Sequence, residues 1–188
     1  MIDNADVQLV KHCLDTYYTK CPQVLPRVPA DMRRGQWQED DWVDWKMIPS
    51  RLTEADVVAL EKKLPFRLPP LFRAFLVTYF VLDLDFGEYQ IPQLSSDAPL
   101  RDVQRYLLQP SLWAIGYSQC ASSGCGDPVC FDLHAPHEEG EFEVVVINHD
   151  MIVPFENWHR RDRVEPHATR VAGSFREFFT RLCLGKPL

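Results

Sequence analysis

Apolar residues near the start of the chain recur at the spacing of a helix. The positions concerned are Val7, Val10, Leu14 and Tyr17, with polar residues between them. This period predicts an amphipathic helix over residues 3–19 that ends near Lys20. Prolines then interrupt regular structure as far as residue 35, at Pro22, Pro26 and Pro29. We therefore expect a linker or an irregular wrap after the first helix.

Two further helices are predicted between residues 53 and 79. The first begins at Thr53, where Asp56 three residues later makes a near capping box, and it stops before Pro65. The second opens at Pro69-Pro70, because proline is tolerated in the first turn of a helix. Their apolar faces are Val57, Leu60 and Leu64 in the first helix and Phe72, Phe75, Leu76 and Tyr79 in the second.

The second half of the chain is dominated by strand patterns. Apolar and β-branched residues predict strands over 113–117, 127–133 and 143–148. Residues 151–155 are predicted to pair with 143–148 as a hairpin, although the polar connection between them has no glycine. In front of these strands, residues 83–100 suggest a loop-rich crossing with short strands at best, and 101–108 a helical piece.

A last helix is predicted from Ser174, because Glu177 follows at the spacing of a capping box. Its buried side is expected to consist of Phe175, Phe178, Phe179 and Leu182. Helices, then antiparallel strands, then a helix is the order of an α+β fold, with a central, mostly antiparallel sheet flanked by helices. We divide the chain into an N-terminal helix with a proline-rich extension, 1–36, and an α+β domain, 37–188.

Composition and charge narrow the classes of partner. The chain has 188 residues, of which 27 are acidic and 20 basic, giving a net charge of -7. Such a field repels phosphate backbones and anionic lipids and attracts cationic partners, so we expect neither nucleic-acid nor membrane binding. No run of 18 apolar residues occurs and the N-terminus is acidic, which predicts a cytoplasmic protein whose six cysteines are free thiols. The oligomeric state stays open.

One short segment combines aromatic and acidic residues at high density. Residues 37–45 hold three tryptophans and four carboxylates. Trp42 and Trp45 can pack on the core while the acids face water, or the segment can form an exposed patch that meets a basic partner. On the second interpretation the partner-binding residues are Trp37, Asp40, Asp41, Trp42 and Asp44, joined by Asp83, Asp85 and Glu88.

Cysteines and histidines between residues 120 and 149 raise the question of a metal or a catalytic thiol. The residues are Cys120, Cys125, Cys130, His134, His137 and His149. Four residues separate each cysteine from the next, which is more than in the tightest zinc knuckles. Cys130 is placed within a strand, where cysteine behaves as a small hydrophobic residue. A thiol nucleophile at Cys120 or Cys125, served by His149 and Asp150, is the catalytic alternative. We predict no metal, no cofactor and no enzymatic activity.

Two aspartates of the predicted strand 127–133 are assigned structural roles. Asp127 and Asp132 are five residues apart, so the strand period places them on opposite faces and argues against an acid-base pair. We expect Asp127 to cap the preceding turn and Asp132 to end the strand in an Asx-type turn.

Four segments together resemble the SUKH superfamily, the Smi/Knr-like proteins. Residues 52–64 and 68–76 are similar to its acidic-start helix, Leu-Glu pair and Leu-Pro-x-x-Tyr/Phe-x-x-Phe-Leu helix. Residues 113–116 and 126–133 resemble its Trp and Gly-Asp-x-x-x-Phe-Asp strands, 144–150 its next strand, and 171–179 its Ala-x-Ser-Phe-x-Glu-Phe ending. The matching motif residues, read as fold-keeping, are Glu61, Pro69, Gly126, Asp127, Phe131, Asp132, Ser174 and Phe175.

The resemblance implies a function as well as a fold. The superfamily is known chiefly for bacterial immunity proteins that bind toxins, often nucleases or deaminases, beside fungal regulators. It therefore implies a non-catalytic protein that neutralises a basic toxin, with a regulatory interaction module as the alternative. Residues 78–82 depart from the family's Asn-Gly-Gly turn, and the first 35 residues fall outside the resemblance.

Overall fold

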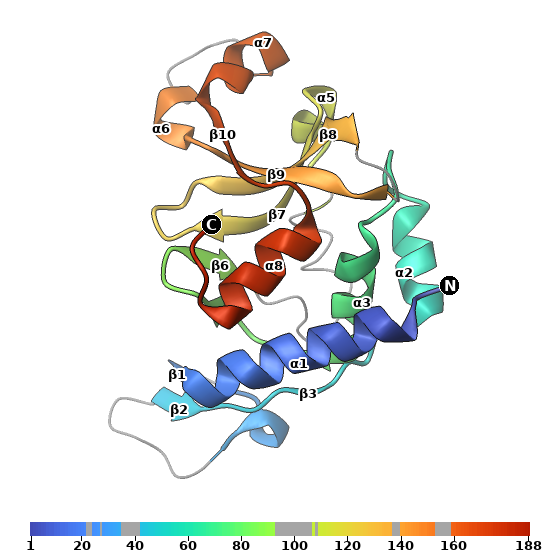
Figure 1. The fold of residues 1–188 in the computed structure, drawn as a ribbon, viewed down its shortest axis with the longest axis vertical. Helices are drawn as coiled ribbons and strands as arrows, with labels where there is room; N and C mark the ends of the chain where they lie inside the picture. Colours follow the sequence, from blue (N-terminus) through green and yellow to red (C-terminus); the bar gives the residue numbers. More distant parts are fainter. Residues whose placement is uncertain are drawn as a thin grey trace.

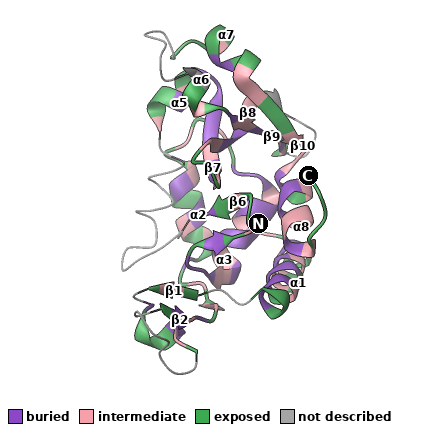
Figure 2. Cartoon of the chain, turned by 90° about the vertical axis from the view of Figure 1, so that its left-hand side faces the viewer, coloured by how far each residue is buried: buried purple, intermediate pink, exposed green. Residues whose placement is uncertain are grey.

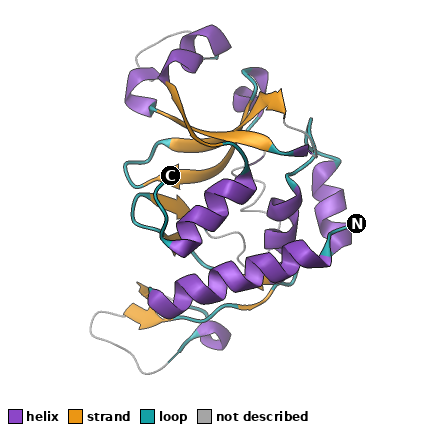
Figure 3. Cartoon of the chain, in the orientation of Figure 1, coloured by secondary structure: helices purple, strands orange, loops and turns teal. Residues whose placement is uncertain are grey.

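The main sheet is antiparallel throughout the part of the chain that the structure describes. The computed structural model describes residues 1–21, 24–26, 28–34, 42–92, 107, 109–136, 140–152 and 159–188. Within these ranges six strands follow the order β10-β9-β8-β7-β6-β5, and each adjacent pair is antiparallel (Figures 1 and 3). With the helices beside it, this sheet confirms the predicted α+β class.

The helices and strands have the following bounds. The helices are α1 (Asn4–Lys20), α2 (Glu54–Glu61), α3 (Pro70–Thr78), α5 (Pro110–Ala114), α6 (His149–Ile152), α7 (Arg161–Val164) and α8 (Phe175–Leu184). The main sheet consists of β5 (Leu84–Asp85), β6 (Tyr89–Ile91), β7 (Tyr117–Ser123), β8 (Pro128–Pro136), β9 (Phe142–Ile147) and β10 (Ala168–Ala172). Two small sheets pair β1 (Val24–Pro26) with β2 (Trp42–Asp44) and β3 (Ile48–Pro49) with β4 (Tyr79–Phe80). Short 3-10 turns cover Ala30–Met32 and Glu165–His167.

One aromatic core joins the sheet to α3 and α8. The ring of Phe72 on α3 lies 5.5 Å from that of Phe131 on β8 and 4.9 Å from that of Phe175 on α8, both in edge-on geometry. Phe75 continues the contact to Phe179, with centroids 5.3 Å apart. Edge-on pairs of this kind stabilise beyond the area that they bury. The predicted apolar faces of both helices therefore meet on one side of the sheet.

Helix α1 belongs to the same core. It contacts α3 and α8, and α8 in turn contacts β9 and β10, so α8 lies between the sheet and α1 (Figure 1). Val10, Cys13 and Leu14 of α1 are fully buried in this cluster. In Figure 2 the buried residues run through β7, α3 and one side of α1. The predicted helix over 3–19 is confirmed, and it is packed rather than appended.

The predicted caps form, with one adjustment. Thr53 Oγ1 accepts the N–H of Asp56 at 3.3 Å, and the Asp56 carboxylate accepts the N–H of Thr53 at 2.8 Å, which completes the capping box of α2. At α8, Ser174 Oγ accepts the N–H of Glu177 at 3.1 Å. The Glu177 carboxylate reaches one residue further back, to the N–H of Gly173 at 2.7 Å.

The strand predicted over 113–117 is wrong. Residues Pro110–Ala114 form the short helix α5, and β7 begins only at Tyr117. Pro110 suits the first turn of a helix, and Trp113 Nε1 donates to the Leu107 carbonyl at 2.9 Å, which holds the indole over that turn. Gly116 then takes a left-handed φ of +80° and reverses the chain. Start and stop signals outweighed the β propensity of the residues between them.

The hairpin predicted between 143–148 and 151–155 is also wrong. Strand β9 pairs instead with β8 and β10, with Ile147 opposite Ala168. The N–H of Asn148 donates to the His167 carbonyl at 3.1 Å, and the chain turns into α6. Because the connection after β9 has no glycine for a tight turn, β9 pairs with a strand further along the chain. Residues 153–155 and most of the predicted helix 101–108 lie outside the described residues.

Candidate functional site

Four of the nine residues of the tryptophan-acid segment, 42–45, lie within the described residues, and they divide between core and surface. Trp45 is fully buried, whereas Trp42 on β2 is 44% exposed. Asp44, next to Trp45, is partly buried. Trp37, Asp40 and Asp41 lie outside the described residues. Trp45 therefore packs on the core, as the first interpretation expects, whereas Trp42 faces solvent. A partner-binding role for the segment stays a prediction.

The second group of predicted partner residues lies on the β5–β6 hairpin. Asp83, Asp85 and Glu88 are all exposed. Asp85 Oδ1 accepts the N–H of Gly87 at 2.8 Å, and Gly87 adopts a φ of +85°. This short Asx-type contact shapes the turn and leaves the remaining carboxylate oxygens at the surface.

Two consecutive tyrosines of α1 connect these two acidic segments. The Tyr17 hydroxyl donates to the Asp85 carbonyl, and its ring lies 4.5 Å from that of Phe86. The Tyr18 ring meets that of Trp45 edge-on at 5.5 Å. Successive side chains on a helix point in different directions, so one turn of α1 holds the hairpin on one side and β2 on the other (Figure 1). Sequence reasoning counted Tyr17 in the apolar face but gave neither tyrosine this role.

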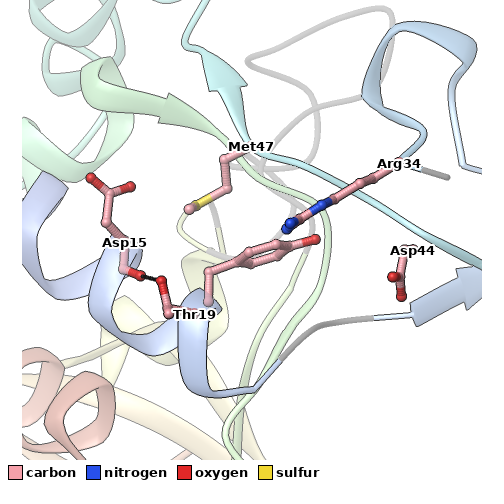
Figure 4. A pocket seen from close by; sticks show the side chains of 6 residues that line it. Asp15, Thr19, Arg34, Asp44 and Met47 are labelled. Atoms are coloured by element: carbon pink, nitrogen blue, oxygen red, sulfur yellow. Dashed lines mark hydrogen bonds between the residues drawn. The ribbon is translucent and has the colours of Figure 1, made fainter.

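A polar hollow of about 460 Å³ opens between the end of α1 and β2 (Figure 4). Its lining residues are Asp15, Tyr18, Thr19, Arg34, Asp44 and Met47. The Asp15 carboxylate accepts the Tyr79 hydroxyl at 3.2 Å. The N–H of Arg34 donates to the Asp44 carbonyl at 2.8 Å. Two carboxylates and one guanidinium, from three segments of the chain, thus line this hollow.

The phenol of Tyr18 lies in the electrostatic field of this hollow. Burial, together with the charge of Asp44, raises the pKa of Tyr18 to about 12, and Arg34 opposes the shift. The backbone of Trp45 is near enough to lower the pKa, but no hydrogen bond of good geometry reaches the hydroxyl within the described residues. Tyr18 is therefore a neutral phenol at physiological pH.

Asp132, one of the motif residues, anchors a buried ion pair. Its carboxylate accepts two hydrogen bonds from Arg161, at 2.7 and 2.9 Å, and the N–H of His134 at 3.0 Å. The last of these is the bond expected of an Asx-type turn. The expectation that Asp132 ends the strand is wrong, because β8 continues to Pro136. The Arg161 guanidinium also lies over the Tyr117 ring, 4.7 Å from its centroid. Nothing in the local sequence connects Arg161 to Asp132, so sequence reasoning missed this pair.

Asp127 does more than cap a turn. Its Oδ1 accepts the backbone N–H of His149 at 3.0 Å and lies 2.6 Å from His149 Nδ1. Burial alone would raise the pKa of Asp127, but the hydrogen bonds from His149 hold it below its usual value. The same bond raises the pKa of His149. This pair fastens the start of α6 to the turn before β8.

The other motif residues lie at structural positions. Glu61 Oε1 accepts the N–H of Leu68 at 3.0 Å, and Pro69 precedes the first turn of α3. Gly126 turns the chain with a φ of +89°. Phe131 and Phe175 are fully buried and Ser174 caps α8.

With this geometry in place, the comparisons with known proteins become informative. A model of the SMI1/KNR4 family (SUKH-1) matches residues 51–181. The chain belongs to this family. No curated protein matches it significantly. The SUKH-1 match covers every motif residue named above and leaves α1, β1 and β2 outside.

The six lining residues of the hollow all lie outside the family match. Asp15, Arg34 and Asp44 come from the N-terminal segments, whereas Tyr79, which holds Asp15, lies within the SUKH-1 region. The N-terminal segments thus add a surface of their own to the shared family fold.

The cysteines of this SUKH-1 chain are arranged as core residues more than as a reactive cluster. Cys120 and Cys130 are buried, and burial raises the pKa of both thiols. Cys125 is exposed, and His149 is engaged with Asp127. Among the described residues, which exclude His137, no three side chains of metal-ligand type come together. In the same residues no helix is long and apolar enough to cross a bilayer.

Proposed function

We propose that this chain is a non-catalytic immunity protein that binds and neutralises a cognate toxin with a basic domain, of the nuclease or deaminase kind. The observation that carries the proposal is the SUKH-1 match over residues 51–181. SUKH proteins are commonly of the toxin-immunity type, and their domain is generally non-catalytic. The partner is thus a protein, and inhibition is stoichiometric.

The distribution of acidic residues supports a basic partner. Asp83, Asp85 and Glu88 on one side of α1, and Trp42 with Asp44 on the other, supply carboxylates and an exposed indole. Opposite charges across an interface raise the association rate and select the partner. An exposed tryptophan buries a large area when a partner binds, and much of the binding energy of an interface concentrates on such residues.

Free thiols are compatible with a cytoplasmic location. The cytoplasm is where a toxin threatens the cell that makes the immunity protein. The six cysteines form no disulfide in the structure. A reducing compartment keeps them so. We therefore place the complex in the cytoplasm. The overall charge of -7 also disfavours nucleic acid as a direct ligand.

The test is capture followed by protection. The full chain serves as bait in lysate of the native cell, and the retained protein is identified and its stoichiometry measured. The captured domain is then expressed with and without the chain. We expect the captured domain alone to arrest growth and the wild-type chain to restore it. We also expect the two proteins to form a complex of about one to one. A captured protein that causes no arrest would favour the regulatory module, and catalytic turnover of any partner would contradict the proposal.

A charge-reversed bait tests the surface. The triple variant Asp40→Lys, Asp41→Lys, Asp44→Lys is expected to associate with the captured toxin more slowly than the wild-type chain. The difference between the two association rates should shrink as salt rises, because salt screens the attraction between charges. Lysine at Asp162, an exposed carboxylate on α7 at the far end of the molecule, is the control (Figure 1). Equal association of both variants would remove this surface from the interface.

A further inference from the structure

We infer that Cys13 and Cys183 are a redox pair, which closes into a disulfide between α1 and α8 when hydrogen peroxide oxidises the chain. The inference goes beyond the proposed function and does not depend on it. Both cysteines lie outside the SUKH-1 match, Cys13 in α1 and Cys183 in the last turn of α8. The bond would therefore fasten the added N-terminal helix to the shared family fold.

Helices α1 and α8 lie side by side and run in the same direction, with matching registers (Figure 1). Near their starts, the Arg176 guanidinium of α8 donates to the Asp6 carboxylate of α1 at 2.5 Å. Cys13 lies two helical turns after Asp6, and Cys183 lies two helical turns after Arg176. An equal advance along two parallel helices brings the two cysteines to the same level, just as Asp6 and Arg176 face each other at theirs.

The two thiols are hydrogen bonded in the core between these helices. Cys13 is 0% exposed and Cys183 is 1% exposed, and both belong to the main hydrophobic cluster. The Cys183 thiol donates a hydrogen bond to the Cys13 sulfur. At the usual interaxial distance of about 8–10 Å, α carbons of two helices that face each other directly lie about 4–5 Å apart, and a disulfide spans about 4.4–6.8 Å. The pair can therefore close without a change of fold.

The other four cysteines are not arranged for such a bond. Cys120 and Cys130 lie on the neighbouring strands β7 and β8 but belong to different hydrophobic clusters, because the side chains of a strand alternate between the two faces of the sheet. Cys21 and Cys125 are exposed, Cys21 after the end of α1 and Cys125 in the turn between β7 and β8. The structure describes all six cysteines, and packing brings the thiols of Cys13 and Cys183 together.

The surroundings of the two sulfurs decide which of them reacts first. The hydrogen bond from Cys183 lowers the pKa of Cys13, whereas burial, together with the same bond, raises the pKa of Cys183. A thiolate is the nucleophile in reactions of cysteine. Cys13 is thus the sulfur that attacks the oxidant, and Cys183 is the thiol that resolves the product.

Two steps complete the reaction, with hydrogen peroxide as the electron acceptor. In the first, the Cys13 sulfur attacks one peroxide oxygen, so that an S–O bond forms, the O–O bond breaks, and the departing hydroxide takes the Cys13 proton and leaves as water. In the second, the Cys183 sulfur attacks the Cys13 sulfur, so that the S–S bond forms, the S–O bond breaks, and the hydroxyl leaves with the Cys183 proton as a second water. The two thiols lose two electrons in total, and these reduce the peroxide.

Burial sets the rate of this reaction, and chain topology sets its effect. Peroxide reaches the buried sulfurs when α1 opens locally, so the pair reacts more slowly than exposed thiols do. A bond between positions 13 and 183 closes almost the whole chain into one loop, which strongly restricts the unfolded state. Because Tyr17 and Tyr18 of α1 hold the β5–β6 hairpin and β2, the bond also keeps those two segments in place.

The experiment oxidises the folded, full-length chain with hydrogen peroxide. Cys21→Ser and Cys125→Ser are introduced into every protein compared, so that the exposed thiols do not react first. The remaining thiols are blocked with N-ethylmaleimide, and unreduced peptides are identified by mass spectrometry. We expect a crosslinked peptide that holds Cys13 and Cys183, a loss of two hydrogens from the intact chain, and reversal by dithiothreitol. The melting temperature of the oxidised chain should be about 10 °C higher than that of the reduced chain.

Variants test whether this pair is responsible. Cys13→Ala and Cys183→Ala should each abolish both the crosslink and the rise in melting temperature. Cys120→Ala removes a buried thiol from β7 and is the matched control, which should keep both. Peptide mapping of the chain that retains Cys13 and Cys183 gives a result that does not depend on how well the variants fold.

Three results would overturn the inference. The first is the absence of a peptide joining Cys13 to Cys183 after oxidation of the folded chain. The second is a crosslink that forms only when denaturant is present, because this would show that the folded structure does not bring the thiols together. The third is a melting temperature that stays the same or falls when the bond forms.

Discussion

Arg161 binds Asp132 through two hydrogen bonds, 2.7 and 2.9 Å long, between residues that are 29 positions apart. Asp132 is 8% exposed, and its carboxylate also accepts the N–H of His134. The pair connects β8 to α7, in which Val164 is the buried residue. Asp132 thereby holds a segment that is distant in sequence.

We predict that Arg161→Ala lowers the free energy of unfolding by about 3 kcal/mol, because it leaves a buried carboxylate without its cation. Urea unfolding monitored by tryptophan fluorescence measures this change. Arg160→Ala removes the neighbouring exposed pair with Asp162 and serves as the control, for which we expect little change. Equal losses in both variants would show that the Asp132 contact contributes nothing special.

The contact between His149 and Asp127 predicts a pH dependence of stability. The pKa of His149 is raised in the folded state, so its contribution is complete below its ordinary value of 6.5 and is lost as pH rises through the raised pKa. The pKa of Asp127 is lowered, so its contribution is complete above 3.8 and is lost as pH falls through the lowered pKa. The pair therefore stabilises most between these two values.

His149→Gln should accordingly destabilise the chain at pH 5.5 and have a smaller effect at pH 8.5. Urea midpoints at the two pH values give the comparison. His12→Gln, at an exposed position on α1, should keep the wild-type pH profile. A loss in His149→Gln that is independent of pH would indicate a packing role instead.

Helix α1 is predicted to be indispensable to the fold. Leu14→Ala should lower the free energy of unfolding by about 3 kcal/mol, since Leu14 is fully buried and its truncation leaves a cavity. Gln8→Ala, on the exposed side of the same helix, should change it little. Denaturant unfolding and the solubility of a chain lacking residues 1–20 measure the effect. A soluble, cooperatively folded truncation would contradict it.

The two tryptophans of the described segment should separate binding from stability. Trp42→Ala is expected to leave the unfolding midpoint nearly unchanged and to weaken the toxin complex by about 2 kcal/mol, as exposed interface tryptophans do. Trp45→Ala should instead destabilise the chain by about 4 kcal/mol, because Trp45 is fully buried. Calorimetry of binding and of unfolding tests both. Unaltered affinity in Trp42→Ala would exclude this indole from the interface.

Local signals predicted the helices well. Thr53 with Asp56, Pro70 in a first turn, and Ser174 with Glu177 act within four residues of one another, and the corresponding helices form where expected. The same kind of signal was overlooked at Pro110 and Gly116, which bound α5 within a stretch of strand-forming residues. Such short elements follow their end residues more than their average propensity.

Strand pairing and the polar contacts were harder to predict. The consecutive β-forming residues Val144 to Ile147 predicted β9, but its neighbour β10 lies twenty residues further on and has only a weak pattern of its own. Likewise Asp132 was expected to close a turn, and only the fold brings Arg161 to it. Long-range partners leave no periodic trace in a single sequence.

The sequence by itself determined the α+β class, the ends of the main helices and the SUKH resemblance, because capping, periodicity and motif spacing are local properties of the chain. Tertiary structure alone decided that α1 completes the core, and that Tyr17 and Tyr18 hold the hairpin and β2 on two sides of one helix turn. The hollow with Asp15, Arg34 and Asp44 arises from that docking. Its residues are distant in sequence, and burial of the apolar face of α1 is what brings them together.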